Sequence, residues 1–234
     1  MTQPDISIII PVLNETGTIN ATLTCLQQQS TETCLEVVIV DADPAGMTIK
    51  AIQITPSSRF VLKTDRTARG RGLQMNRGAE IATAPIILFL HADTRLPEGA
   101  FEAAISTLQN PHLVGGAFDL GIRSNRWGYR VIETVGSIRS RITRLPYGDQ
   151  AIFVRRDYFH DMGGYSTIPI MEDVDLMRRI KNQGDSIAII ARRVQTDPRR
   201  WEKEGLVTGT FRNWVLMILY LMGVSPHKLV KYYR

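Results

Sequence analysis

The sequence contains few of the residues that build a disulfide framework, a zinc site or a secretion signal. It has two cysteines, Cys25 and Cys34, without a CxxC spacing and without a histidine close to either. A secreted fold stabilised by disulfides and a Cys/His zinc site are therefore both disfavoured. The first ten residues, MTQPDISIII, also lack the basic segment and the small-residue cleavage site of a signal peptide. We predict two buried thiols in a cytoplasmic protein.

No apolar run has the length of a membrane-spanning helix. The longest one near the C-terminus covers residues 214–224, WVLMILYLMGV, whereas a spanning helix needs about 20 residues. The basic stretch HKLVKYYR follows it closely. Such a segment docks peripherally on an anionic membrane surface, packs against its own domain, or forms a homodimer seam. We favour packing within the protein or a dimer slightly over contact with the inner face of the membrane.

The composition is that of a soluble globular protein, with 44% apolar and 22% charged residues, so disorder of the whole chain is disfavoured. The net charge of +5 suits a nucleic acid, an anionic membrane or a phosphorylated small molecule, and does not choose among them. A chain of 234 residues fits one domain with a small appendage. We predict a domain over residues 1–205 and a C-terminal helical extension over residues 206–234, packed on the domain or on a partner.

Strand-like and helix-like segments alternate along the chain. Continuous apolar runs, typical of strands buried on both faces, occur at 6–13, 35–41, 59–63 and 85–93, and further strands are predicted at 115–122, 148–156 and 186–190. Helical patterns occur at 18–28, 98–108, 127–142 and 171–184. This alternation predicts an α/β fold with a doubly wound, mostly parallel, Rossmann-like sheet. Ligands bind such sheets at the carboxyl ends of the strands.

Polar and acidic residues stand where three of these strands end. The first is followed by Asn14 and Glu15, the second by Asp41-Ala42-Asp43, and the fourth by His91-Ala92-Asp93. One interpretation is that they start turns or cap helices, which is the commonest use of Asp and Asn. Three such ends together favour a ligand crevice.

Several motifs, in this order, resemble one known family. They are ISIIIPVLNE, VVIVDADP, GRGLQMNRGAEIATAPIILFLHADT, YGDQAIFVRRDYFHDMGGY and MEDVDLMRR. Together they resemble family 2 glycosyltransferases, which have the GT-A fold, over roughly residues 5–205. The sequence looks closest to the small bacterial subgroup associated with radical-SAM and selenium-domain proteins.

The resemblance implies a metal-dependent, inverting transfer of a sugar from a nucleotide-diphosphate sugar to a hydroxyl acceptor. A UDP-sugar is favoured over a GDP-sugar, the acceptor is a small molecule or is lipid-linked, and no nucleic acid is involved. A nucleotidyltransferase that makes sugar nucleotides is the first alternative, although the turn LNETGT lacks a glycine-rich loop with lysine. A non-catalytic module that binds nucleotide or a membrane surface is the second.

The resemblance places Asp93 at the last carboxylate of the family's Asp-x-Asp motif, where it would hold the metal and the diphosphate. His91 replaces the first Asp of that motif. It is predicted either as a second ligand of Mn²⁺ or Mg²⁺, with imidazole suiting Mn²⁺ better, or as a donor contact. The alternative for His91 is a hydrogen bond within the crevice. Ala92 lies between them in the predicted nucleotide-sugar site.

The predicted catalytic base is Asp173. Apolar residues at 174, 177 and 180 predict a helix whose first turn carries Glu172 and Asp173. Unpaired N–H groups there keep a carboxylate ionised, as a base requires, although plain capping is the alternative. The family's Glu-Asp motif puts the base on its second residue, so Glu172 would orient Asp173 or contact the acceptor.

The remaining predicted contacts come from the resemblance as well. Asp41 matches the base-binding aspartate, although the sequence DADP departs from the family's Asp-Asp-Gly-Ser, so Asp43 is an alternative. Pro11 and Glu15 line the same mouth. The stretch of residues 69–78, which contains several glycines, is expected to reach the diphosphate, because guanidinium pairs well with phosphate. Its candidates are Arg69, Arg71, Asn76 and Arg77.

Two segments are predicted on the acceptor side. The first is the loop Gly148-Asp149-Gln150, for which an ordinary turn is the alternative. The second contains Arg200 and Trp201, at the place where processive relatives carry Gln-x-x-Arg-Trp. Asp197 stands where those relatives have the Gln. This departure, together with the lack of spanning helices, argues against a polymer-extruding synthase.

Overall fold

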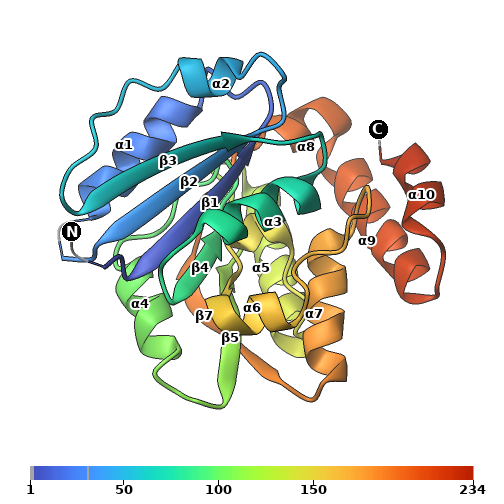
Figure 1. The fold of residues 1–234 in the computed structure, drawn as a ribbon. Helices are drawn as coiled ribbons and strands as arrows, with labels where there is room; N and C mark the ends of the chain where they lie inside the picture. The colour runs from blue at the N-terminus through green and yellow to red at the C-terminus, as the bar shows by residue number, and fades with distance from the viewer. Residues whose placement is uncertain (1–2, 31, 234) are drawn as a thin grey trace.

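A computed structural model describes residues 3–30 and 32–233 and has one seven-stranded sheet with helices on both faces (Figure 1). The strand order is β3-β2-β1-β4-β6-β5-β7. Strand β6 pairs antiparallel with β4 and with β5, and the other pairs are parallel. The predicted α/β architecture with a mostly parallel sheet is therefore confirmed.

The strands are β1 (Ile6–Val12), β2 (Leu35–Asp41), β3 (Phe60–Arg66), β4 (Ile86–Phe89), β5 (Leu113–Asp119), β6 (Phe153–Arg155) and β7 (Ser186–Arg193). The longer helices are α1 (Ile19–Gln29), α3 (Arg71–Ile81), α4 (Ala100–Thr107), α5 (Trp127–Thr143), α7 (Glu172–Asn182) and α9 (Leu206–Leu221). The short ones are α2 (Met47–Lys50), α6 (Arg156–Asp161), α8 (Arg199–Glu204), α10 (Pro226–Leu229) and the 3₁₀ turns η1 (Gly148–Gln150) and η2 (Val230–Tyr232).

The first strands are continuous apolar runs because both faces of the sheet are covered. Every residue of β2 is buried, and so are all residues of β1 except Pro11. Ile8 and Ile10 face a core shared with α1 and α4. Ile9 faces a second core shared with α3, α6 and α7. Two cores, one on each face, fix the sheet as a rigid platform whose strand ends carry the site.

Two expectations about individual segments were wrong. The predicted strand at 148–156 is shorter, because residues 148–150 form η1 and only Phe153–Arg155 pair as β6. Ala151 has a left-handed backbone (φ 48°), which separates the turn from the strand. The thiols of Cys25 and Cys34 are half-buried, not buried, since Cys25 lies toward the solvent side of α1 and Cys34 precedes β2.

The C-terminal helices lie against the end of the domain (Figure 1). One face of α9 packs on α7 through a small apolar cluster that includes Val174, Leu216 and Tyr220. The proposed boundary after residue 205 falls between α8 and α9, which pack against each other. Within residues 3–30 and 32–233, no helix combines the length and the apolar character needed to cross a membrane.

Candidate active site

The site lies at the carboxyl ends of β1, β2 and β4, which are neighbours in the sheet and parallel to one another. The structure therefore brings Glu15, Asp43 and Asp93 to the same edge of the sheet. Helix α8 lies beside this edge (Figure 1), and its first residue, Arg199, reaches across to the strand ends. Chain segments far apart in sequence thus meet at one place.

Arg199 joins the acidic groups of this edge. Its Nη2 lies 3.1 Å from Asp93 Oδ2 and 3.6 Å from Glu15 Oε2. Its Nε lies 3.4 Å from Asp197 Oδ1. The side chains of Asp93 and Glu15 are about one quarter exposed, at 27% and 25%, so the cluster faces solvent. Asp93 is accessible to a ligand, but it already has a cationic partner.

Asp173 occupies the first turn of α7, as predicted. Its Oδ2 accepts a 2.6 Å hydrogen bond from the N–H of Gly148, and its Oδ1 accepts one of 2.7 Å from the N–H of Val174. Met171, the residue before the first residue of α7, has a left-handed backbone (φ 66°). Such conformations concentrate at functional sites, where the surrounding structure enforces them. The carboxylate is therefore held in one orientation by the loop on the acceptor side.

His91, which follows the end of β4, lies near Gly148 and Asp173. A Cβ added to Gly148 would lie 3.2 Å from His91 Nε2 and 3.5 Å from Asp173 Oδ2, so the glycine separates the two side chains without filling the space. His91 Nε2 is buried and has no hydrogen-bond partner in the part of the chain that the structure describes. Burial, together with the charges of Arg71 and Arg200, lowers the pKa of His91 to about 3. The imidazole is therefore neutral at physiological pH.

Glu172 is buried and forms an ion pair with Arg71 at 3.3 Å. Burial raises the pKa of the Glu172 carboxyl, opposed by Arg71 and reinforced by the charge of Asp173. Because Arg71 begins α3 and Glu172 begins α7, this pair ties together the starts of two helices next to Asp173. Of the four residues predicted to reach the diphosphate, Arg71 is the one tied to this centre.

The other three residues of that group lie elsewhere. Asn76 is bonded on both sides to the backbone of Tyr165, with both distances 2.8 Å. Arg77 pairs at the surface with Asp65 and Glu80, and Arg69 is exposed. Asn76 and Arg77 thus already have partners within the protein, which does not favour a diphosphate contact for either.

Asp41 also differs from the expectation. It is fully buried, and its two carboxylate oxygens accept the backbone N–H groups of Asp43 (2.9 Å) and Thr48 (3.1 Å). Asp43 in turn accepts the N–H groups of Ala45 and Met47. Asp41 therefore shapes the turn after β2 from inside, and Asp43, which is half-buried, is the one closer to solvent.

Two smaller predictions concern backbone positions. Pro11 is half-buried in β1 beside Val40. Ala92 is buried, and its carbonyl oxygen accepts a 2.5 Å hydrogen bond from the Thr22 hydroxyl. Both lie near the carboxyl ends of their strands, as expected.

In the loop predicted on the acceptor side, Asp149 and Gln150 differ in their hydrogen bonding. Gln150 is buried, and it accepts from the Ser140 hydroxyl at 2.6 Å and donates to the Phe118 carbonyl at 2.8 Å. Its carboxamide oxygen also accepts from the Tyr147 N–H at 3.1 Å, so Gln150 holds the loop from inside, whereas an acceptor contact was predicted. Asp149 Oδ1 is buried and lacks a hydrogen-bond partner among the described residues. Burial raises the pKa of Asp149 to about 6, against the effect of Arg139.

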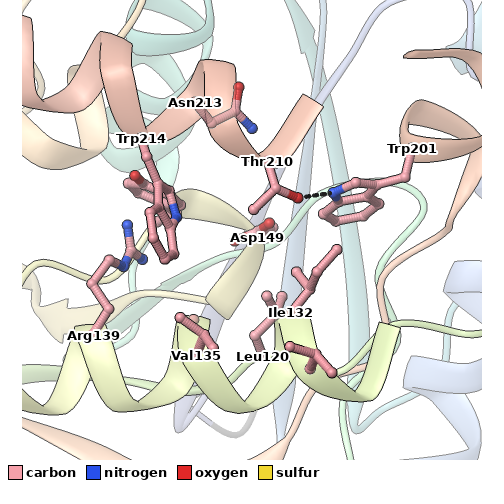
Figure 2. Close-up of a pocket in the computed structure, with 12 residues that line it drawn as sticks. Leu120, Ile132, Val135, Arg139, Asp149, Trp201, Thr210, Asn213 and Trp214 are labelled. Carbon is pink, nitrogen blue, oxygen red and sulfur yellow. Dashed lines mark hydrogen bonds between the residues drawn. The ribbon is translucent and has the colours of Figure 1, made fainter. Parts of the chain in front are cut away.

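Arg200 and Trp201 lie where α8 meets the C-terminal segment. Arg200 donates to the Tyr233 hydroxyl at 2.6 Å, and its guanidinium lies 4.3 Å from the centre of that ring. Trp201 donates from Nε1 to the Thr210 hydroxyl at 3.3 Å (Figure 2). The C-terminal segment thus contributes to the border of the site.

Sequence reasoning missed Arg199, Arg139 and Tyr233. Arg199 stands directly before the predicted Arg200, and nothing in the sequence distinguishes the two. Arg139 was one of several arginines on a predicted helix, and it stacks on Tyr147 with 3.4 Å to the ring centre. Only the packing of α5 and α8 onto the sheet reveals these positions.

Comparison with known proteins agrees with this geometry. The profile of glycosyl transferase family 2 matches residues 7–169, and the chain belongs to this family. The sequence is 31% identical over 175 residues to a PGL/p-HBAD biosynthesis glycosyltransferase of Mycobacterium tuberculosis, covering 71% of this chain and 65% of that protein. The chain thus spans somewhat less than two thirds of the length of this relative.

Solved structures share the fold. The mannosyltransferase PcManGT from Pyrobaculum calidifontis, in complex with GDP-Man and Mn²⁺, superposes with a TM-score of 0.68 at 20% identity, over 91% of this chain and 61% of that one. TarS residues 1–349 from S. aureus gives 0.63 at 14% identity, over 98% and 70%. The predicted GT-A fold is confirmed.

Proposed function

We propose that the chain transfers a glycosyl group, with inversion, from a nucleotide-diphosphate sugar to a hydroxyl acceptor, with Asp173 as catalytic base. The observation that carries this proposal is the meeting of Asp173, His91 and Asp149 around Gly148, next to the acidic strand ends. Membership in family 2 supports the reaction class. The bacterial subgroup named above stays a prediction.

In this mechanism Asp173 takes the proton of the acceptor hydroxyl as its oxygen bonds to the anomeric carbon. The bond from that carbon to the diphosphate oxygen breaks, and the electron pair leaves with the diphosphate. The Gly148 N–H, 2.6 Å from Asp173 Oδ2, fixes the carboxylate toward the acceptor side. Arg71 stands 3.3 Å from Glu172, and it supplies positive charge beside the diphosphate.

The residues present fit a divalent metal that takes most of its ligands from the donor. Within the described ranges no group of three His, Cys, Asp or Glu side chains is arranged to hold a metal alone. Mg²⁺ is usually bound by one or two carboxylates plus substrate phosphates, and Mn²⁺ also accepts imidazole. Asp93 would be the carboxylate, and the unpartnered His91 Nε2 would be an additional ligand that favours Mn²⁺. When bound, such a metal neutralises charge on the leaving diphosphate.

We further propose that the turn from Asp41 to Asp43 contacts the nucleobase, with Asp41 holding its shape. A UDP-sugar is our first expectation and a GDP-sugar the second. The relative with GDP-Man and Mn²⁺ supports a nucleotide sugar and a divalent metal in general. A cytoplasmic location and the division at residue 205 remain proposals, consistent with the helices described above.

The proposal is tested by titrating UDP, GDP and their sugars into the protein with and without Mn²⁺ by calorimetry. We expect saturable binding that strengthens with Mn²⁺ and weakens in Asp93→Asn. Asp65→Asn, a carboxylate paired with Arg77 on the surface, is the matched control and should bind as wild type. If no nucleotide bound in any condition, the proposed function would be wrong.

A further inference from the structure

Helices α5 and α9 form a groove whose outer part is apolar. Two adjoining pockets, of about 170 Å³ and about 320 Å³, share Val131, Ile132, Thr210 and Trp214 in their walls. We call the two pockets together the α5–α9 groove. Figure 2 shows its inner part, with α5 on one side, α9 on the other and Trp201 at one end. At 1.5 Å per residue, the groove runs about 18 Å along α5 from Trp127 to Arg139.

The outer end of the groove exposes large apolar side chains. Trp127 is 81% exposed and Phe211 is 67% exposed. The second pocket is lined by these two rings, by aliphatic side chains and by Trp214. Contiguous exposed apolar surface of this kind marks a binding site for an apolar body. The groove therefore suits a hydrocarbon chain better than a sugar.

The inner end of the groove is polar and reaches the candidate active site. Asp149 and Arg139 line the first pocket, and Figure 2 shows Asp149 behind the cleft between the two helices. Asp149 Oδ1 and Arg139 Nε are buried without hydrogen-bond partners among the described residues. Buried polar atoms are normally paired, so these two indicate a polar ligand group at this end. Asp149 follows Gly148, whose N–H holds Asp173.

We infer that the α5–α9 groove binds an amphiphilic acceptor, with its hydroxyl end at Asp149 and its hydrocarbon chain between α5 and α9. The assignment of this ligand as the acceptor rests on the proposed function. The binding of an amphiphile to the groove does not depend on it. The hydroxyl group donates to Asp149 and lies next to the base, and the chain covers Val131 and Phe211. The groove thereby selects acceptors that carry a long apolar part.

The chain offers a direct probe of the groove. It contains three tryptophans, Trp127, Trp201 and Trp214, and all three line the two pockets. Titration with 11-bromoundecan-1-ol, which has a hydroxyl at one end and a quenching bromine at the other, should quench their fluorescence saturably. 2-Bromoethanol has the same two groups without the chain, and it should give only linear collisional quenching.

A matched pair of variants on α5 separates the groove from the rest of the helix. Val131 and Ile138 are each 50% exposed, but only Val131 lines the pockets. Val131→Asp is expected to weaken binding of 11-bromoundecan-1-ol by about tenfold or more, because a carboxylate beside the chain must be desolvated. Ile138→Asp should bind as wild type, and circular dichroism should show both variants folded.

Three results would overturn the inference. One is quenching that never saturates, and another is equal weakening in both variants. The third is evidence that this apolar face binds a membrane instead. The protein would then bind anionic phosphatidylglycerol vesicles but not the monomeric probe. Val131→Asp and Ile138→Asp would weaken vesicle binding equally. Nucleotide titration of the same proteins keeps the two proposals apart. If UDP or GDP binds normally with Mn²⁺ but the probe does not bind, only the inference about the groove is refuted. If the probe binds but neither nucleotide does, the proposed transferase function is refuted.

Discussion

The two sides of Asp173 are built differently. On the side of the strand ends, the acidic groups already have partners, since Arg199 pairs with Asp93 and Glu15. Asp41 accepts backbone N–H groups. On the side of the α5–α9 groove, Asp149 and Arg139 keep buried polar atoms without partners, and the walls beyond them are exposed and apolar. Under the proposed function, a donor exchanges existing contacts, whereas an acceptor fills unmet ones.

The largest expected effect lies at the boundary between the two sides. Asp173→Asn removes the proton acceptor, so transfer should fall by about 10²- to 10⁴-fold, measured as nucleotide released per turnover. Nucleotide binding by calorimetry should change little, because the donor side is intact. Asp157→Asn, at a side chain that is 86% exposed on α6, is the control. Transfer at the wild-type rate in Asp173→Asn would refute the assignment of the base.

Gly148→Ala tests how closely the two sides approach each other. The added Cβ would lie 3.2 Å from His91 Nε2, which is tight enough to shift the imidazole, and 3.5 Å from Asp173 Oδ2, which is an ordinary contact. A small misplacement of catalytic groups is costly, so we expect transfer to drop by roughly tenfold or more, with little change in melting temperature. Gly17→Ala, which meets nothing within 4 Å, should behave as wild type. An unchanged rate in Gly148→Ala would show that the gap between His91 and Asp173 is not used.

Arg199→Ala tests whether the donor side is held closed by its own ion pairs. Removal of the guanidinium frees Asp93 and Glu15, so Mn²⁺ binding without nucleotide should tighten by up to about fivefold, the scale of an exposed ion pair. Electron paramagnetic resonance of free Mn²⁺ measures this directly. Arg77→Ala, which breaks a surface pair away from the site, should leave the affinity unchanged. Weaker Mn²⁺ binding in Arg199→Ala would contradict the role of Arg199 as a competitor.

The smallest effect concerns the unpaired carboxyl on the groove side. The pKa of Asp149 is raised to about 6 by burial, above its usual value. The folded state therefore binds the Asp149 proton more tightly than the unfolded state does. The stability that this difference contributes is lost, and the free energy of unfolding falls, as pH rises from about 4 through about 6. Asp149→Asn should remove this loss in thermal unfolding curves recorded across that range. Asp157→Asn should retain the wild-type profile, and an unchanged profile in Asp149→Asn would contradict the raised pKa.

Much of the fold could be predicted from the sequence. The runs that became β1 and β2 are apolar at nearly every position because both faces are covered, and that pattern is visible without coordinates. Glu172 and Asp173 were predicted in the first turn of a helix from the spacing of its apolar residues, and this was confirmed for α7. The polar residues predicted at strand ends do lie together at one edge of the sheet.

The roles of single polar residues were harder to predict. Asp41 and Gln150 matched positions associated with ligand contacts, yet both are buried and use their oxygens for the fold. Arg199 and Arg200 are adjacent and chemically identical, yet one pairs with Asp93 and the other with Tyr233. Which partner a side chain finds depends on segments that lie many residues away.

By itself the sequence determined the sheet, the edge that carries the site and the placement of Asp173, because these follow from local apolar patterns and from the order of the motifs. Only the tertiary structure decided that Gly148 holds Asp173 opposite His91, that Arg199 pairs with Asp93 and Glu15, and that α5 and α9 leave an apolar groove ending at Asp149. The physical reason is that hydrogen bonds, ion pairs and grooves are made between distant segments. Their geometry is set by how the helices pack on the sheet, and no local pattern encodes that packing.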